Sequence, residues 1–350
     1  MSQFIALLER HQTQLKQQYG TRLNQDICRA ITDMLHCKSD TSRVSQWHCE
    51  HCQHDQQHPA SCGNRNCPQC LHQTTSNWLA KQTSKLLPVH YFMVTFTLPY
   101  QLRAIARQHP KILYQLMFQV TSTLLKDFAM REDKGSLGFT SVLHTHNRKR
   151  ELHPHLHIIV PSGRYDAAKQ QWHKGDSRYL FNAFSLANVW RARMMEAIHH
   201  HAELTLPSDM PSKWVVDCRK VGFGLSSLQY LSRYLYRGVL PDKDIINITD
   251  DKVTFRYREG GSNITKTRTL PVLKFLWLIL QHVLPKGLQR VRDYGFLRGN
   301  AKTLRLKIQL LLGFALDLAS PAKTIKVSAS CICPCCQHAM QFTGYFRLKI

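Results

Sequence analysis

The sequence is short of acidic residues: 23 Asp and Glu stand against 47 Lys and Arg, which leaves a formal net charge of +24. This excess calls for a polyanionic partner if the charge is gathered on one face, with nucleic acid as the first candidate. The ordinary alternatives are a basic soluble enzyme and a protein of the membrane surface.

Long apolar runs are also lacking. The most apolar stretch, LKFLWLILQHVL at 273–284, falls short of the roughly 20 residues that span a bilayer and predicts a core helix. The first residues, MSQFIALLERHQTQ, lack the basic start, apolar stretch and cleavage site of a secretory leader. We therefore expect a cytoplasmic protein with reduced thiols, in which paired cysteines are metal ligands more often than crosslinks.

Cysteines, by contrast, are abundant, with 12 in the chain. Cys49-x-x-Cys52 and Cys67-x-x-Cys70 have the spacing of a four-cysteine zinc site. Four sulfur ligands leave no open position, so we predict a structural zinc ion. The region is rich in Cys, His and polar residues, and metal must supply the stability that apolar residues do not. Six further residues lie near enough to compete as ligands or to complete a second site: Cys37, Cys62, His48, His54, His58 and His72.

A second group of cysteines lies near the C-terminus, in SCICPCCQHAM. Cys333-x-x-Cys336 is half of a zinc site, and no second pair follows it in the sequence. Its completion by His338, by another cysteine of the group or by a distant residue stays open, as does a disordered thiol-rich tail. No internal repeat is apparent.

Helical and strand patterns alternate along the chain. The periodicity predicts helices at 1–45, 110–130, 182–204, 226–237, 271–285 and 302–316. It predicts strands at 91–99 and 214–221, and two antiparallel hairpins, one formed by GFTSVLHTH and HPHLHIIV and one by INITDD and KVTFRYRE. This order predicts an α+β fold, an antiparallel-centred sheet flanked by helices.

The length of 350 residues predicts two or three compact domains. We expect a helical and zinc-binding domain at 1–87, a sheet domain at 88–260 and a helical region with a Cys-rich tail at 261–350.

Two histidines in the central predicted hairpin alternate along a strand. His155 and His157 share one face because strand side chains alternate, so they can hold one divalent ion such as Mg²⁺ or Mn²⁺. Among 20 histidines an isolated His-x-His is weak evidence. Two imidazoles are too few for an octahedral ion, and the candidates for a third ligand are His144, His146, Glu151 and Gln229.

Tyrosines on a later predicted helix are the third element of a possible site. Tyr230 and Tyr234 are about one helical turn apart, and Arg233 and Arg237 stand nearby to receive phosphate oxygens. Tyrosines at this spacing more often pack in a core. Their conjunction with a histidine pair and a basic chain favours nicking of DNA by a tyrosine, assisted by a divalent cation.

Together these motifs resemble the HUH tyrosine transposases of rolling-circle insertion sequences, in the branch with an N-terminal zinc-binding domain. The resemblance covers nearly the whole chain and rests on SCGNRNCPQC, LLPVHYFMVTFTLP, LHPHLHIIVPSG, QYLSRYLYR and QHVLPKGLQRVRDYGFL.

The resemblance implies roles for these residues. His155 and His157 match the metal-binding histidines, and Tyr230 and Tyr234 match the tyrosine motif, with Tyr236 leaving the first nucleophile open. It implies a nicking domain at 88–260, a bacterial mobile element, and action on single-stranded DNA or hairpin ends through a 5′-phosphotyrosine. The rival hypotheses are a plasmid replication initiator or relaxase with the same site, and an inactive DNA-binding relative.

Overall fold

The structure is a computed structural model that describes residues 2–39, 43–70, 74–132, 135–236, 239–259, 264–313 and 331–347. It divides into two compact units, one made of Met1–His72 with Leu316–Ile350 and the other of Gln73–Ala315. We call them the terminal unit and the sheet unit. The chain thus returns at its C-terminal end to the unit in which it begins, which the expected division at 87 and 260 did not include.

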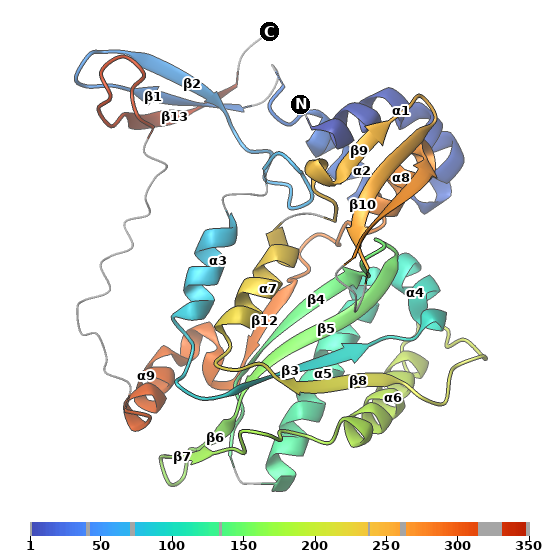
Figure 1. Ribbon diagram of the computed structural model, residues 1–350, viewed down its shortest axis with the longest axis vertical. Helices are drawn as coiled ribbons and strands as arrows, with labels where there is room; N and C mark the ends of the chain where they lie inside the picture. The colour runs from blue at the N-terminus through green and yellow to red at the C-terminus, as the bar shows by residue number, and fades with distance from the viewer. Residues whose placement is uncertain are drawn as a thin grey trace. The chain divides into compact units, whose positions relative to one another are not determined.

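The described part of the terminal unit is formed by helices, a 3-10 turn and a small sheet (Figure 1). Their bounds are α1 (Gln3–Tyr19), η1 (Gly20–Arg22), α2 (Gln25–Leu35), β1 (Arg43–His48), β2 (Asp55–Pro59) and β13 (Gln341–Arg347). The helix α2 begins where the side chain of Asn24 accepts a hydrogen bond from the amide of Ile27. The strands form an antiparallel sheet in the order β13-β1-β2, so the last strand of the chain pairs with the first.

The sheet unit contains the other described elements (Figure 1). Its helices are α3 (Thr74–Thr83), α4 (Arg103–Gln108), α5 (Pro110–Glu132), α6 (Ala183–His199), α7 (Leu225–Tyr236), α8 (Val272–Leu280) and α9 (Lys302–Leu311), with 3-10 turns η2 (Tyr100–Leu102), η3 (Asp242–Asp244), η4 (Gly295–Leu297) and η5 (Gly299–Ala301). Its strands are β3 (Tyr91–Thr97), β4 (Phe139–His146), β5 (Leu152–Pro161), β6 (Gly163–Asp166), β7 (Gln171–Lys174), β8 (Val215–Lys220), β9 (Ile245–Ile248), β10 (Lys252–Arg258), β11 (Thr265–Pro271) and β12 (Val291–Tyr294).

A five-stranded antiparallel sheet in the order β12-β4-β5-β3-β8 is the centre of the sheet unit. The predicted α+β class is confirmed, and so is the central hairpin, formed by β4 and β5. In its register His144 lies opposite His155 and Val142 lies opposite His157.

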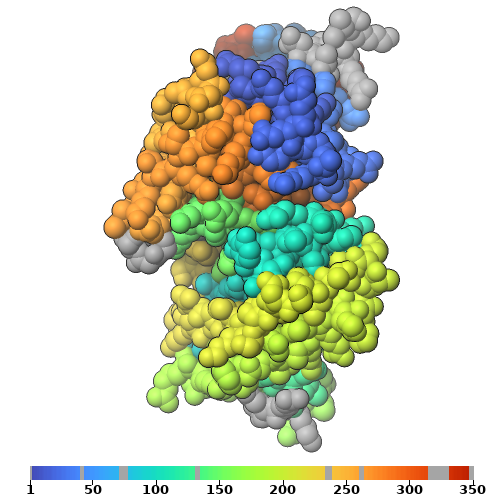
Figure 2. Space-filling model, turned by 90° about the vertical axis from the view of Figure 1, so that its right-hand side faces the viewer, coloured from blue at the N-terminus to red at the C-terminus, as the bar shows by residue number. Residues whose placement is uncertain are grey.

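The two faces of this sheet carry different layers. Leu156, Ile158 and Val160 of β5 point into the largest apolar core, which also contains side chains of α5 and α6. Figure 2 shows the outer side of that layer, where teal atoms of the α4 and α5 region lie against yellow-green atoms around α6. On the other face Ile159 packs with Leu228 of α7, in a cluster that includes side chains of α3. The odd-numbered residues of β5, including both predicted histidine ligands, therefore face α7.

A separate three-stranded sheet, in the order β11-β10-β9, packs with α8. The ring of Phe255 on β10 lies 5.6 Å from the ring of Phe275 on α8. The stretch predicted as a core helix at 273–284 is helical as far as Leu280, with Phe275 and Leu276 fully buried. Among the described residues, no helix has both the length and the apolar character that crossing a membrane requires.

Gly295, the first residue of η4, offers a stability test of the packing of η4 against the segment that leads into β4. It has φ +56, and a Cβ there would collide with the backbone carbonyl of Leu137. We expect Gly295→Ala to lower the free energy of unfolding by roughly 3 kcal/mol or more, because a left-handed conformation and a backbone clash add together.

The matched control is Gly299→Ala, where a Cβ meets nothing within 4 Å. Its free energy of unfolding should stay within about 0.5 kcal/mol of the original. Urea unfolding of both variants measures the difference, and equal midpoints would contradict the packing described.

Candidate active site and cysteine clusters

Three histidines meet on the α7 side of the central sheet. His144 comes from β4, and His155 and His157 come from β5. Their ring centroids lie 5.1 Å (His144 to His155), 4.6 Å (His144 to His157) and 4.8 Å (His155 to His157) apart. One nitrogen from each lies within 4.8 Å of those of the others, which is the arrangement of a three-ligand metal site. Of the four candidates for a third ligand, His144 is the one in this cluster.

Hydrogen bonds fix the orientation of two of these rings. Nδ1 of His155 donates to the carbonyl oxygen of His153 at 2.7 Å, so its proton is on Nδ1 and its Nε2 is left with the lone pair. Nδ1 of His157 lies 3.0 Å from Oγ1 of Thr95 on β3. Such partners on the far nitrogen orient a metal-ligating imidazole and set its tautomer.

Burial keeps these imidazoles neutral, which is the form that binds metal. Burial is the main reason that the pKa of His155 falls to about 4 and that of His157 to about 3, each helped by a neighbouring imidazole. The pKa of His144 lies well below its ordinary value, first through burial and then through repulsion by His157 and His155. The three rings therefore offer a divalent ion lone pairs at neutral pH.

Tyr230 lies beside this cluster. It belongs to α7, which begins just after Gly224, a residue with φ +87. The ring of Tyr230 is 6.2 Å from that of His157 at an interplanar angle of 86°, and it also packs against the apolar cluster under α7. The backbones of Arg233 and Tyr234 continue α7, but their side chains, and Arg237 altogether, lie outside the described residues.

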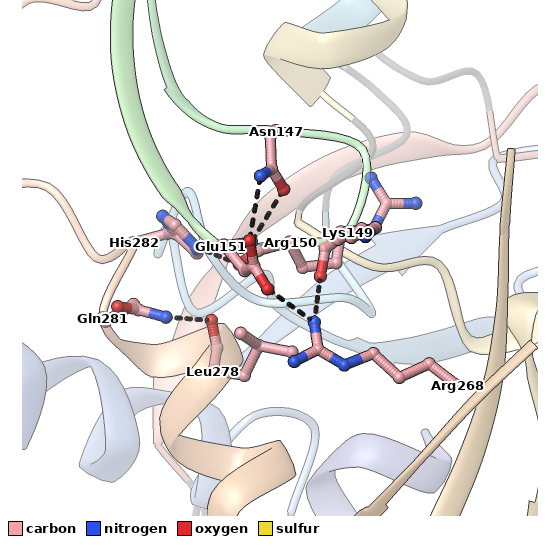
Figure 3. A network of polar contacts seen from close by, with 8 residues as sticks. All are labelled: Asn147, Lys149, Arg150, Glu151, Arg268, Leu278, Gln281 and His282. Carbon is pink, nitrogen blue, oxygen red and sulfur yellow. Dashed lines mark hydrogen bonds and ion pairs between the residues drawn. The ribbon is translucent and has the colours of Figure 1, made fainter. Parts of the chain in front are cut away.

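The turn between β4 and β5 is held by a polar network (Figure 3). Oε1 of Glu151 accepts from Nη1 of Arg268 on β11 at 3.2 Å, and Asn147 bonds both the amide and the carboxylate of Glu151. Nη1 of Arg268 also donates to the carbonyl oxygen of Lys149 at 3.1 Å. Glu151, a candidate third ligand, is thus part of the turn and does not lie in the histidine cluster.

The two other candidates also lie elsewhere. His146 is buried with its ring 5.1 Å from that of His282, and Nε2 of His282 donates to the carbonyl oxygen of Arg150 at 2.8 Å. Burial lowers the pKa of His282 to about 4. Gln229 is exposed on α7.

Three residues that adjoin the cluster were not predicted: Thr95, Arg219 and Arg290. Arg219 on β8 and Arg290, just before β12, both lower the pKa of cluster histidines through their positive charge. Arg290 is held by a bond from its Nε to the carbonyl oxygen of Leu143 at 2.9 Å. The alternation in YFMVTFT indicated which face of the strand Thr95 lies on. It could not indicate that His157 is its neighbour, because that depends on the pairing of β3 with β5.

The predicted zinc ligands are arranged differently from the expectation. Cys49 and Cys52 do not join Cys67 and Cys70 in one site. The structure forms two clusters, each of which completes one C-x-x-C pair with two other cysteines: Cys37, Cys62, Cys67 and Cys70 in the first, and Cys49, Cys52, Cys333 and Cys336 in the second. The single site is therefore corrected to two, because each pair has sulfur partners nearer than the other pair.

In the first cluster Sγ of Cys70 lies 3.3 Å from Sγ of Cys37 and 3.8 Å from Sγ of Cys62. Cys37 and Cys67 are buried, so the cluster is closed to solvent on that side. Four sulfurs at these distances suit a structural zinc ion.

Comparisons with known proteins agree with both regions. A family model described as "Putative transposase" matches residues 138–304, and one described as "Transposase zinc-binding domain" matches residues 7–98. The chain is 30% identical over 305 residues to "Putative transposase y4qJ" of Sinorhizobium fredii (strain NBRC 101917 / NGR234), covering 79% of this chain and 76% of the relative. It is 23% identical over 288 residues to "Transposase for insertion sequence element IS801" of Pseudomonas savastanoi pv. phaseolicola, covering 76% of this chain and 69% of the relative. No solved structure matches.

The buried histidines lead to a pH prediction. In metal-free protein His155 and His157 should remain neutral at pH 5.5, because their pKa values are about 4 and about 3. The unfolded chain takes up these protons near pH 6.5, so the stability of the fold should fall as the pH drops from 6.5 towards 4. Side-chain ¹⁵N chemical shifts measure the protonation, with His155→Ala and His157→Ala giving the assignments. Midpoints near 6.5 for both rings would contradict the burial described.

Proposed function

Because this chain belongs to the insertion-sequence transposases that carry a zinc-binding domain, we propose that it nicks and rejoins single-stranded DNA at the ends of its element through a 5′-phosphotyrosine. Membership of the family implies cleavage and transfer of DNA strands in general. That a tyrosine carries out the cleavage is our proposal. The observation that carries it is the distance of 6.2 Å between the rings of His157 and Tyr230.

We assign the divalent metal, Mg²⁺ or Mn²⁺, to His144, His155 and His157. Their neutral rings and mutually close nitrogens support the assignment. When bound, such an ion supplies positive charge to the non-bridging oxygens of a scissile phosphate. Three protein ligands would leave positions for the oxygen donors that these ions prefer, which DNA phosphate and water could fill.

Tyr230 is the proposed nucleophile. Its phenolic oxygen forms a bond to phosphorus while the bond from phosphorus to the 3′ oxygen breaks. The phenolic proton leaves to solvent, which the half-buried ring allows, and the 3′ oxygen takes up a proton. The phosphotyrosine ester retains the energy of the broken ester, so a 3′-hydroxyl can reverse the step without ATP. Tyr234, the second tyrosine of the motif, would allow a second end to be opened while the first is held.

Two arginines near the cluster are suited to bind the DNA backbone. Arg219 is largely exposed on β8 and forms an ion pair with Asp217 at 2.6 Å. On the other side of the β4–β5 hairpin, Nε of Arg290 donates a hydrogen bond to the carbonyl oxygen of Leu143. Guanidinium groups bind phosphate through paired donors, so we propose that these two residues add to the Arg233 and Arg237 that the sequence suggested.

A replication initiator or relaxase with the same chemistry is the rival enzyme, and an inactive DNA-binding relative is the rival outside enzymes. The descriptions of the matched families and relatives name transposases, which favours a transposase over both rivals. An inactive relative would bind DNA without forming an adduct.

The central test is a covalent adduct. Protein with Mn²⁺ or Mg²⁺ and a 3′-labelled single strand carrying the element's end should give a labelled protein band, because the tyrosine keeps the 5′ phosphate of the downstream piece. Tyr230→Phe should lower the yield at least a hundredfold, since the attacking oxygen is removed. His157→Ala should reduce it strongly and raise the metal concentration required.

Tyr179→Phe is the control, because Tyr179 is an exposed tyrosine of the same unit outside the histidine cluster. Its adduct yield should match that of the original protein. If Tyr230→Phe retains the adduct and Tyr234→Phe loses it, the nucleophile is reassigned. If no variant and no metal gives an adduct while DNA binding persists, the inactive relative is correct.

DNA affinity should depend steeply on salt, because neutralised phosphates release counterions. We expect about a thousandfold loss between 50 and 200 mM salt for six or more phosphate contacts. Arg219→Ala should lower the slope of log K against log salt by about one. Arg178→Ala is the matched control, since Arg178 is also an exposed arginine facing an aspartate two residues earlier, Asp176. Equal slopes for the two variants would remove Arg219 from the DNA-binding surface.

A further inference from the structure

The two ends of the chain carry the same short motif. Residues 49–54 read CEHCQH and residues 333–338 read CPCCQH, so Cys, Cys, Gln and His recur at the same four positions. The first copy directly follows β1, and the second stands shortly before β13.

The two copies also have the same backbone conformation. In the first, the amide of Gln53 donates to the carbonyl oxygen of Cys49 at 2.7 Å; in the second, the amide of Gln337 donates to that of Cys333 at 2.9 Å. Each turn is closed by a bond of 2.9 Å from the amide of its first cysteine to the carbonyl oxygen of its histidine. Gln53 has φ 59 and Gln337 has φ 60, a left-handed conformation that is uncommon outside glycine.

These turns face each other in a reciprocal way. Sγ of Cys49 lies 3.4 Å from Sγ of Cys336, and Sγ of Cys52 lies 3.4 Å from Sγ of Cys333. The first cysteine of each copy thus meets the second cysteine of the other. The rings of His51 and His338 stack beside them, with centroids 3.9 Å apart.

The sulfur distances identify the chemistry. They are far longer than the roughly 2.05 Å of a disulfide. Sulfurs that surround a tetrahedral zinc ion at about 2.3 Å lie about 3.8 Å from one another, which is close to the observed separation. Cys49 and Cys333 are fully buried, so two of the four sulfurs are withdrawn from solvent.

We propose that Cys49, Cys52, Cys333 and Cys336 bind a second structural zinc ion, which joins the two ends of the chain. The zinc-binding family match covers residues 7–98 and includes only half of this ligand set. The site closes a long loop, because Cys52 and Cys333 are 281 positions apart in the sequence. Four thiolates fill the coordination sphere, so this ion has no catalytic position.

The ion would also anchor β13. That strand pairs with β1, but the apolar cluster at the site is small, with Cys49, Cys333 and Met340 as its buried members. So little buried apolar surface is insufficient to hold a separate segment in place. Zinc coordination supplies the missing stability, so the last strand depends on the metal.

Zinc stoichiometry of the full chain tests the proposal. Protein with His155→Ala and His157→Ala, which removes the histidine site, should hold two zinc ions by elemental analysis, and the cysteine variants are made in this background. Cys333→Ser with Cys336→Ser should leave one, and Cys67→Ser with Cys70→Ser should also leave one. Cys335→Ser is the matched control, because Cys335 adjoins Cys336 in the same turn but is outside the cluster, and it should keep both ions. One ion in the background protein, or two in Cys333→Ser with Cys336→Ser, would overturn the proposal.

A conservative variant distinguishes the loss of a zinc ligand from misfolding. Cys336→His keeps a zinc ligand and should retain two ions. Amide hydrogen exchange should be slow in residues 341–347 of this variant and at least tenfold faster in Cys333→Ser with Cys336→Ser. Unchanged exchange there would show that the metal does not anchor β13. Neither measurement requires DNA, so the outcome is independent of the proposed function.

Discussion

The antiparallel pairing of β4 with β5 is the interaction on which the candidate active site depends. It sets His144 opposite His155, and side chains on paired strands approach within about 5 Å on one face. A slip of one residue would turn the imidazoles into the apolar core and expose Leu156 and Ile158. The aliphatic face therefore holds the register, and the polar network of the turn, with Glu151 and Arg268, holds its end.

Five imidazoles in one region, three of them buried and two half-buried, oppose folding, since each would otherwise be solvated. Their pKa values are lowered mainly by that burial, so the rings stay neutral while the apolar core on the other face of the sheet stabilises the strands that carry them. Neutral rings are also what a metal requires. The same burial that weakens the fold in acid thus prepares the histidines for coordination, and Thr95 and the carbonyl of His153 orient two of them.

Local patterns in the sequence were sufficient for the central elements. The alternation in HPHLHIIV predicted β5 and the common face of His155 and His157, and the helical spacing of QYLSRYLYR predicted α7. The short strands β1, β2 and β13 were not predicted, because their apolar residues do not alternate and they depend on pairing across the chain. Contacts between distant segments were equally inaccessible: nothing local to Thr95 or Arg290 indicates that it adjoins a histidine.

The same limit explains the error in the zinc site. Spacing within a C-x-x-C pair is local and was read correctly, but the choice of partner pair is set by folding. Cys67 and Cys70 are joined by Cys37 and Cys62, whose spacing forms no motif, and Cys49 and Cys52 by a pair at the far end of the chain. A six-residue repeat is too short to stand out from a chain with 12 cysteines until its two copies adopt one conformation. Since the second copy is synthesised after the whole sheet unit, and that unit has an apolar core of its own, the sheet unit can fold before the second cysteine cluster is complete.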